Sequence, residues 1–125
     1  MLYNAASLIS RGLLKSPPHV QFVMGIPNAL PARRSVLEFL IEEYKEVIPV
    51  GTWTAAGIGR YQFEVAQWCL ELGGNCRTGL EDNIKFDRAR LANSNAELVK
   101  KLVDVMPVYN RQPASPTEAR EILGL

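Results

Sequence analysis

Three short apolar runs alternate with amphipathic helical segments along the chain, and this alternation restricts the fold more than any other feature. The runs span residues 20–24, 47–56 and 75–80. Apolar runs of this length are typical of strands that are buried on both faces. Strands that alternate with helices of ten or more residues form parallel units with right-handed crossovers. The sequence therefore predicts an α/β fold with a parallel sheet, either closed into a barrel or open.

Apolar residues at helical spacing predict three helices among these strands. The stripes are Leu2, Ala6, Ile9 and Leu13; Val36, Leu37, Leu40, Ile41 and Tyr44; and Tyr61, Val65, Trp68, Cys69 and Leu72. Gly12, followed by Ser16-Pro17-Pro18, is expected to end the first helix, and Gly73-Gly74 the third.

Two capping signatures predict where the C-terminal helices begin. Ser94 with Glu97 fits a capping box before an apolar stripe, and Ser115 with Glu118 repeats the signature. The last helix is expected to be short and to end at Gly124.

The number of strands limits what the chain is expected to do alone. It opens on a helix and contains three strand-like runs in 125 residues, whereas a closed (β/α)₈ barrel takes about 250 residues. Parallel strands with open edges leave backbone groups unpaired and apolar faces uncovered. We therefore expect the isolated chain to be unstable, or to associate with another barrel portion or with itself.

Composition and charge exclude several classes of partner. The formal net charge is +1, with basic and acidic residues interspersed, so no basic field for nucleic acid is expected. No apolar run approaches the roughly 20 residues that cross a bilayer. The start of the chain lacks the pattern of a signal peptide, which predicts a cytoplasmic protein. Cys69 and Cys76 lie among apolar neighbours and are expected to be buried free thiols.

The third apolar run carries charged residues that are unusual for a buried strand. If residues 75–80 are extended, Arg77, Gly79 and Glu81 share one face. Glu81 then lies at the C-terminal end of the strand, where α/β folds place their active sites. One interpretation makes Glu81 a ligand of a divalent metal and Asp82 either a proton acceptor or a residue that orients another side chain. The other is a structural ion pair between Arg77 and Glu81, followed by a simple turn.

A second candidate site is the loop after the second run. Gly57, Gly59 and Arg60 follow a strand and open a helix, so backbone amides and a guanidinium there suit a phosphate. A tight turn is the alternative, because the third glycine of the dinucleotide fingerprint is absent. His19 lies at the opposite end of the first strand and is expected to be structural. Trp53 and Trp68 are expected in the core.

The segment Gly73-Gly74-Asn75-Cys76-Arg77-Thr78-Gly79-Leu80-Glu81-Asp82-Asn83 resembles the signature segment of the β-keto acid cleavage enzymes, a family that includes 3-keto-5-aminohexanoate cleavage enzyme. The resemblance continues in the same order at residues 22–27, 53–60, 91–99 and 117–125. It covers essentially the whole chain.

The resemblance implies that residues 1–125 are the C-terminal part of a zinc-dependent (β/α)₈ barrel, or TIM barrel. Such an enzyme condenses a β-keto acid with acetyl-CoA and releases acetoacetate and a new acyl-CoA. By position, Glu81 matches the family's carboxylate zinc ligand. Arg77 and Asp82 match the pair associated with substrate activation and proton transfer.

Two departures from the family pattern leave three hypotheses for the chain. The His-x-His pair that supplies the family's other zinc ligands is absent, and Asn75 stands where the family usually has histidine. The chain is then the C-terminal segment of an enzyme whose N-terminal half is either a separate chain or missing from this sequence, or it is a non-catalytic truncated remnant. The third hypothesis is a module that binds coenzyme A or phosphate through the loop from Gly57 to Arg60.

Overall fold

The computed structural model describes residues 1–15 and 17–125 and shows an α/β fold built on a small parallel sheet. The strands are β1 (His19–Met24), β2 (Thr52–Gly57) and β3 (Asn75–Cys76), in the spatial order β1-β2-β3. β1 pairs with β2 from His19 opposite Thr52 to Met24 opposite Gly57. This confirms the predicted α/β class and the parallel sheet. Within the described residues the sheet stays open, because its two outer edges have no neighbouring strand.

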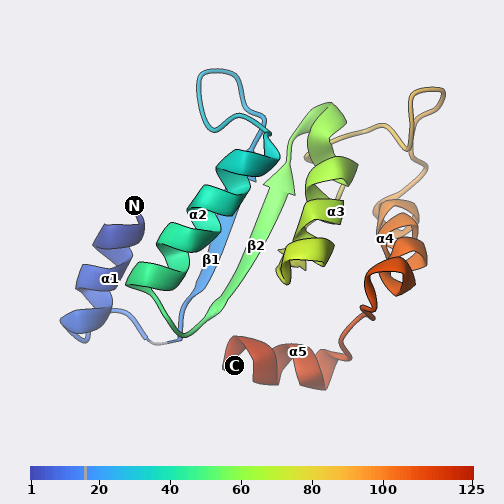
Figure 1. Cartoon of the computed structure of the whole chain (residues 1–125). Coiled ribbons are helices and arrows are strands. Elements are labelled where there is room, and N and C mark those ends of the chain that lie inside the picture. The colour runs from blue at the N-terminus through green and yellow to red at the C-terminus, as the bar shows by residue number, and fades with distance from the viewer. Residues whose placement is uncertain (16) are drawn as a thin grey trace.

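The helices lie against this sheet and extend past it on both sides (Figure 1). The α-helices are α1 (Leu2–Ser10), α2 (Arg34–Val47), α3 (Gln62–Leu72), α4 (Asn95–Val105) and α5 (Pro116–Leu123), and short 3₁₀ turns span η1 (Gly59–Tyr61) and η2 (Met106–Tyr109). Figure 1 shows α2 and α3 side by side across the sheet, with α1 next to α2. None of the helices in the described part of the chain is long and apolar enough to span a membrane.

The core lies between the sheet and the two helices α2 and α3. Its fully buried side chains include Met24, Leu37, Val65 and Cys69, and Trp53 packs beside them. Burial of such side chains contributes about 1.5–3 kcal/mol each. Both cysteines are free as predicted, although Cys76 is only half-buried.

Trp53 also fixes the start of β3. A Cβ at Gly74 would lie 2.3 Å from the Trp53 ring, so the indole lies directly against the glycine backbone. Gly74 directly precedes the residue at which β3 begins. The close approach of ring and backbone therefore holds β3 beside β2.

The predicted bounds of two strands are wrong. The second strand was expected from Val47, but Val47 is the last residue of α2, and β2 begins at Thr52. Ile48 is buried against the core, so its apolar character reflects packing of the helix end. The third strand was expected to reach Leu80, but β3 ends at Cys76. The backbone amide of Leu80 bonds to the Asn95 side chain instead of to a neighbouring strand.

The helix ends follow from their caps. Ser115 and Glu118 form the full capping box, and α5 ends before Gly124 as predicted. The Ser94 side chain accepts from Glu97 as expected, but the Glu97 carboxylate bonds to the Asn93 amide rather than to Ser94.

The first helix ends earlier than its apolar stripe suggests. α1 stops at Ser10, so Leu13 lies beyond it. Gly12 adopts a φ of +68°, its amide bonds to Ile9 and the Leu13 amide bonds to Leu8, which is a Schellman ending. Ser16, part of the predicted stop signal, lies outside the described residues.

Candidate active site

A tight turn after β3 brings together the three charged residues that the sequence singled out. Arg77 donates from Nε to Asp82 Oδ2 at 2.8 Å and from Nη2 to Asp82 Oδ1 at 2.7 Å. The same Nη2 lies 2.6 Å from Glu81 Oε2. Two parallel bonds to one carboxylate give a geometrically specific ion pair. The strand face predicted for Arg77 and Glu81 does not form, because β3 ends at Cys76. The ion pair between Arg77 and Glu81 that the structural alternative predicted is present, and Asp82 joins it from the turn.

The three side chains differ sharply in exposure. The Asp82 side chain is 2% exposed and that of Arg77 is 36% exposed, whereas the Glu81 side chain is 81% exposed. The hydrogen bonds to Asp82, with those charges close by, raise the pKa of Arg77. Asp82 is thus a buried carboxylate with a fixed partner, and Glu81 is a solvent-facing carboxylate at the rim.

Gln62 fastens this turn from the first residue of α3. Its Nε2 donates to the Gly79 carbonyl at 2.8 Å, and its Oε1 accepts from the Thr78 hydroxyl at 3.0 Å. Gln62 is 3% exposed, so both bonds form away from water, where an unmade bond is costly. The sequence reasoning missed Gln62. The available signal was a polar residue at the start of a helix that packs on the sheet.

Asn95 holds the turn from the opposite side. Its Oδ1 accepts from the Leu80 amide at 2.7 Å, and a Cβ at Gly79 would lie 3.2 Å from the same oxygen. The Gly59 amide donates to the Asp82 carbonyl at 2.7 Å. The turn is therefore tied to α4 and to the loop after β2, as well as to α3 through Gln62.

The loop after β2 uses its backbone donors inside the protein. Besides the Gly59 amide, the Ile58 amide donates to the Met24 carbonyl at 2.9 Å. A Cβ at Gly57 would lie 2.4 Å from the Tyr61 carbonyl oxygen, and Gly59 has a φ of +60°. Both glycines thus have a conformational or packing role in a tight turn. The Arg60 guanidinium is exposed and bonds to the Tyr61 hydroxyl at 2.6 Å.

His19 lies at the opposite end of the sheet, as expected. Its Nδ1 is 2.8 Å from the Thr52 hydroxyl and its Nε2 is 2.9 Å from the Thr54 hydroxyl. Partial burial lowers the pKa of His19. These contacts link β1 to β2. Within residues 1–15 and 17–125, no group of three or more His, Cys, Asp or Glu side chains is placed to hold a metal ion.

Comparison with known proteins shows where this arrangement belongs. The model of the β-keto acid cleavage enzyme family matches residues 1–125. The chain is 46% identical over 125 residues to a 3-oxoadipate:acetyl-CoA acetyltransferase of Cupriavidus necator, covering 100% of the chain and 44% of that protein. It is 41% identical over 126 residues to a 3-keto-5-aminohexanoate cleavage enzyme of Fusobacterium nucleatum, again with 100% and 44% covered.

A more distant relative has a different substrate in its name. The chain is 33% identical over 125 residues to a 3-dehydrocarnitine:acetyl-CoA trimethylamine transferase of Rhizobium meliloti, covering 99% of the chain and 40% of that protein. The chain thus spans less than half the length of these curated relatives. Because the family model matches it from end to end, the chain belongs to the β-keto acid cleavage enzyme family.

Proposed function

We propose that the chain is part of an enzyme that condenses a β-keto acid with acetyl-CoA and releases acetoacetate and a new acyl-CoA. The observation that carries this proposal is the family match over residues 1–125. It is supported by two relatives whose names specify acetyl-CoA and two different substrates. The chain alone covers 44% of the Cupriavidus protein, so we propose that turnover also requires the remaining portion.

The remaining portion is proposed to complete a (β/α)₈ barrel of which residues 1–125 form the C-terminal part. The open edges of β1 and β3 support this proposal, because unpaired edges of a parallel sheet need a covering partner. A second portion that pairs with both edges closes the sheet. A second copy of the chain is the alternative occupant.

Arg77 and Asp82 are proposed to activate the substrate. Both Asp82 oxygens accept bonds from Arg77, and the release of one bond makes that oxygen more available to accept a proton. Arg77 is 36% exposed and can turn toward the carboxylate of an arriving β-keto acid. That movement frees an oxygen of Asp82 to accept the proton, and the substrate itself thereby triggers the base.

Glu81 is proposed to supply one ligand to a zinc ion. One of its oxygens bonds to Arg77, and the side chain is 81% exposed, so the other oxygen faces solvent. Catalytic zinc sites use three protein ligands, and the described residues contain no such group. The donor set is therefore incomplete among the described residues, and we assign the other ligands to the remaining portion. When bound, zinc polarises the keto carbonyl.

Gly57, Gly59 and Arg60 are proposed to contribute to the binding of acetyl-CoA. Since the Gly59 amide is engaged with Asp82, we assign the direct contact to the Arg60 guanidinium and the shape of the loop to the glycines. An exposed guanidinium is well suited to a phosphate. A module that binds coenzyme A without turnover is the second candidate function, and this loop favours it equally.

The proposal is tested by producing the chain together with the portion of the Cupriavidus relative that lies outside the match. Acetoacetate is measured after addition of acetyl-CoA, Zn²⁺ and either 3-oxoadipate or 3-keto-5-aminohexanoate. Glu81→Gln, at an exposed position, is expected to leave the complex intact and to lower zinc affinity or turnover by about 100-fold. Lys45→Ala, on α2, is the control and should change neither. A stable zinc-loaded complex that forms no acetoacetate from either acid contradicts the proposal.

A further inference from the structure

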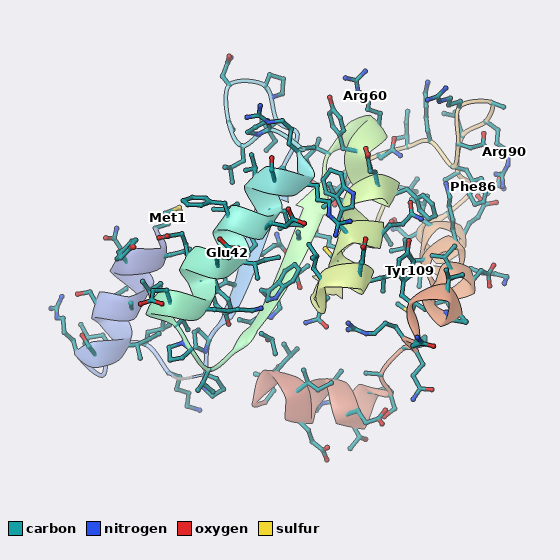
Figure 2. All side chains as sticks on the ribbon, in the orientation of Figure 1. Met1, Glu42, Arg60, Phe86, Arg90 and Tyr109 are labelled. Carbon is teal, nitrogen blue, oxygen red and sulfur yellow. The ribbon has the colours of Figure 1, made fainter. Side chains whose placement is uncertain are left out.

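A cavity of about 870 Å³ opens between the start of α3, the loop of residues 83–88 and α4. Its lining combines three aromatic rings with four cations. The rings belong to Tyr61, Phe63 and Phe86, and the cations are Arg60, Lys85, Arg88 and Lys101. Figure 2 shows Arg60 at the start of α3, and Phe86 and Arg90 together on the loop that leads to α4.

The cations around this cavity form no close ion pairs within the described residues, although the Asp87 carboxylate is near enough to Lys101 to interact with its charge. In the part of the chain that the structure describes, none of the four forms an ion pair with a carboxylate. Two carboxylates also line the cavity, those of Glu64 and Asp87. Asp87 is committed to the loop itself, because its Oδ1 accepts from the amides of Ala89 and Arg90. The cavity therefore carries an excess of positive charge.

Lys101 occupies the aromatic side of the cavity. Its Nζ lies 4.3 Å from the centre of the Phe63 ring and 4.6 Å from that of Phe86, and it donates to the Phe86 carbonyl. Burial lowers the pKa of this amine. A cation held between aromatic faces is partly desolvated, so an added anion gains more from it than from a fully hydrated lysine.

The loop that forms one wall is already ordered by its own contacts. The Arg90 guanidinium lies 3.8 Å from the centre of the Phe86 ring and 2.8 Å from Glu97 on α4. Together with the turn made by Asp87, these contacts fix the loop before any ligand binds. A preformed wall reduces the ordering cost of binding.

The cavity also reaches the candidate active site. Gly59, Thr78 and Asn83 line it, and Gly59 donates directly to the Asp82 backbone. Asn83 follows Asp82 in sequence, and Thr78 follows Arg77. The cavity therefore reaches the backbone next to Arg77 and Asp82, although neither of these residues lines it.

We propose that this cavity binds the phosphorylated adenine nucleotide of coenzyme A, with Lys85 and Arg88 joining Arg60 as phosphate ligands and the base next to the aromatic side of the cavity, where Lys101 lies against Phe63 and Phe86. The choice of coenzyme A among adenine nucleotides rests on the proposed function. The binding site itself does not, because every lining residue belongs to this chain. Its position directs the thioester arm toward Asp82.

The test is calorimetric titration of the full 125-residue chain with coenzyme A, 3′,5′-ADP and ATP. The variant Lys85→Ala with Arg88→Ala removes two side chains of the loop and should weaken both coenzyme A and 3′,5′-ADP by about tenfold or more, because charge-assisted bonds to phosphate are lost. The matched control is Lys15→Ala with Lys45→Ala, which removes the same charge away from the cavity. Circular dichroism establishes that all the chains share one fold.

Three results would overturn the inference: equal affinity of coenzyme A for the variant and the unchanged chain, failure of both coenzyme A and 3′,5′-ADP to bind the folded chain, or an equal loss of affinity in the control variant. ATP binding as tightly as coenzyme A would also overturn the assignment, since the cavity would then prefer nucleoside triphosphates. Nucleotide binding without acetoacetate formation in the reconstituted complex would instead reject the proposed function and leave this inference standing.

Discussion

Arg77 donates hydrogen bonds to both carboxylate oxygens of Asp82, which lies five residues further along the chain. This ion pair sets the path of the backbone after β3. The Asp82 side chain is 2% exposed, so its hydrogen bonds with Arg77 form largely out of contact with water. Glu81, which precedes Asp82 in the sequence, accepts a hydrogen bond from the same guanidinium nitrogen of Arg77, Nη2, as Asp82 does. Two adjacent carboxylates thereby acquire different surroundings from a single arginine.

Asp82→Asn should destabilise the chain by about 2 kcal/mol, because it removes the charge that Arg77 faces while keeping the size of the side chain. Urea unfolding followed by circular dichroism measures the change. Glu81→Gln is the matched control and should cost less than about 0.5 kcal/mol at its exposed position. Equal losses for the two variants would show that burial of Asp82 does not govern the strength of the pair.

Gln62→Ala should cost about 1–3 kcal/mol, since it leaves the Gly79 carbonyl and the Thr78 hydroxyl without their buried partner. Gln67→Ala, on the same helix, removes one bond of 3.2 Å to the Tyr109 hydroxyl and should cost less than about 1 kcal/mol. Both values come from urea unfolding. The assigned role of Gln62 fails if the Gln67 variant is the less stable of the two.

Gly57→Ala should destabilise the chain more than Gly59→Ala. At position 57 the added Cβ meets the Tyr61 backbone at 2.4 Å, whereas at position 59 nothing lies within 4 Å and the cost is the strain of a φ of +60°. We expect a loss of about 3 kcal/mol or more for the first variant and about 1 kcal/mol for the second. Thermal unfolding distinguishes them, and the reverse order would contradict the close packing of Gly57 on Tyr61.

Glu97 should make stability depend on pH in acid. Two hydrogen bonds lower the pKa of Glu97 to about 2: the bond from Arg90 has the larger effect, and the bond from the Asn93 amide the next largest. Because the folded pKa lies below the ordinary value of 4.5, the contribution is complete above that value and is lost as the pH falls toward 2. The unfolding midpoint of the Glu97→Gln variant should therefore depend less on pH between these values than the midpoint of the unchanged chain does. Glu121→Gln, on α5, is the control and should leave the slope unchanged.

Local sequence signals predicted the helices better than the strands. The apolar stripes of α2 and α3 and the capping box at Ser115 depend on interactions between residues a few positions apart. Such interactions can be recognised from the sequence alone. Strand ends depend on partners that are distant in sequence. β3 stops at Cys76 because its last pairing with β2 is there, opposite Ala55. Val47 and Ile48 resembled a strand start because apolar residues at a helix end and in a buried strand look alike.

The sequence located the candidate site but not its construction. Glu81 and Asp82 were placed at the end of a strand, and the structure puts them on a turn. Alternation along an extended strand separates neighbouring residues onto opposite faces, so the residue pattern did not predict the ion pair between Asp82 and Arg77, and only the family resemblance placed the two residues together. Gln62 and Asn95 approach the turn from α3 and α4. No local sequence pattern predicts such tertiary contacts.

The contact between Trp53 and Gly74 links two positions that are far apart in sequence. Any side chain at 74 would collide with the indole, and a smaller residue at 53 would leave a void where the ring now lies. Substitution at either position alone is therefore costly. Among homologues, these two positions should accordingly vary as a pair, with a larger residue at 74 tolerated only where the aromatic ring at 53 has been lost.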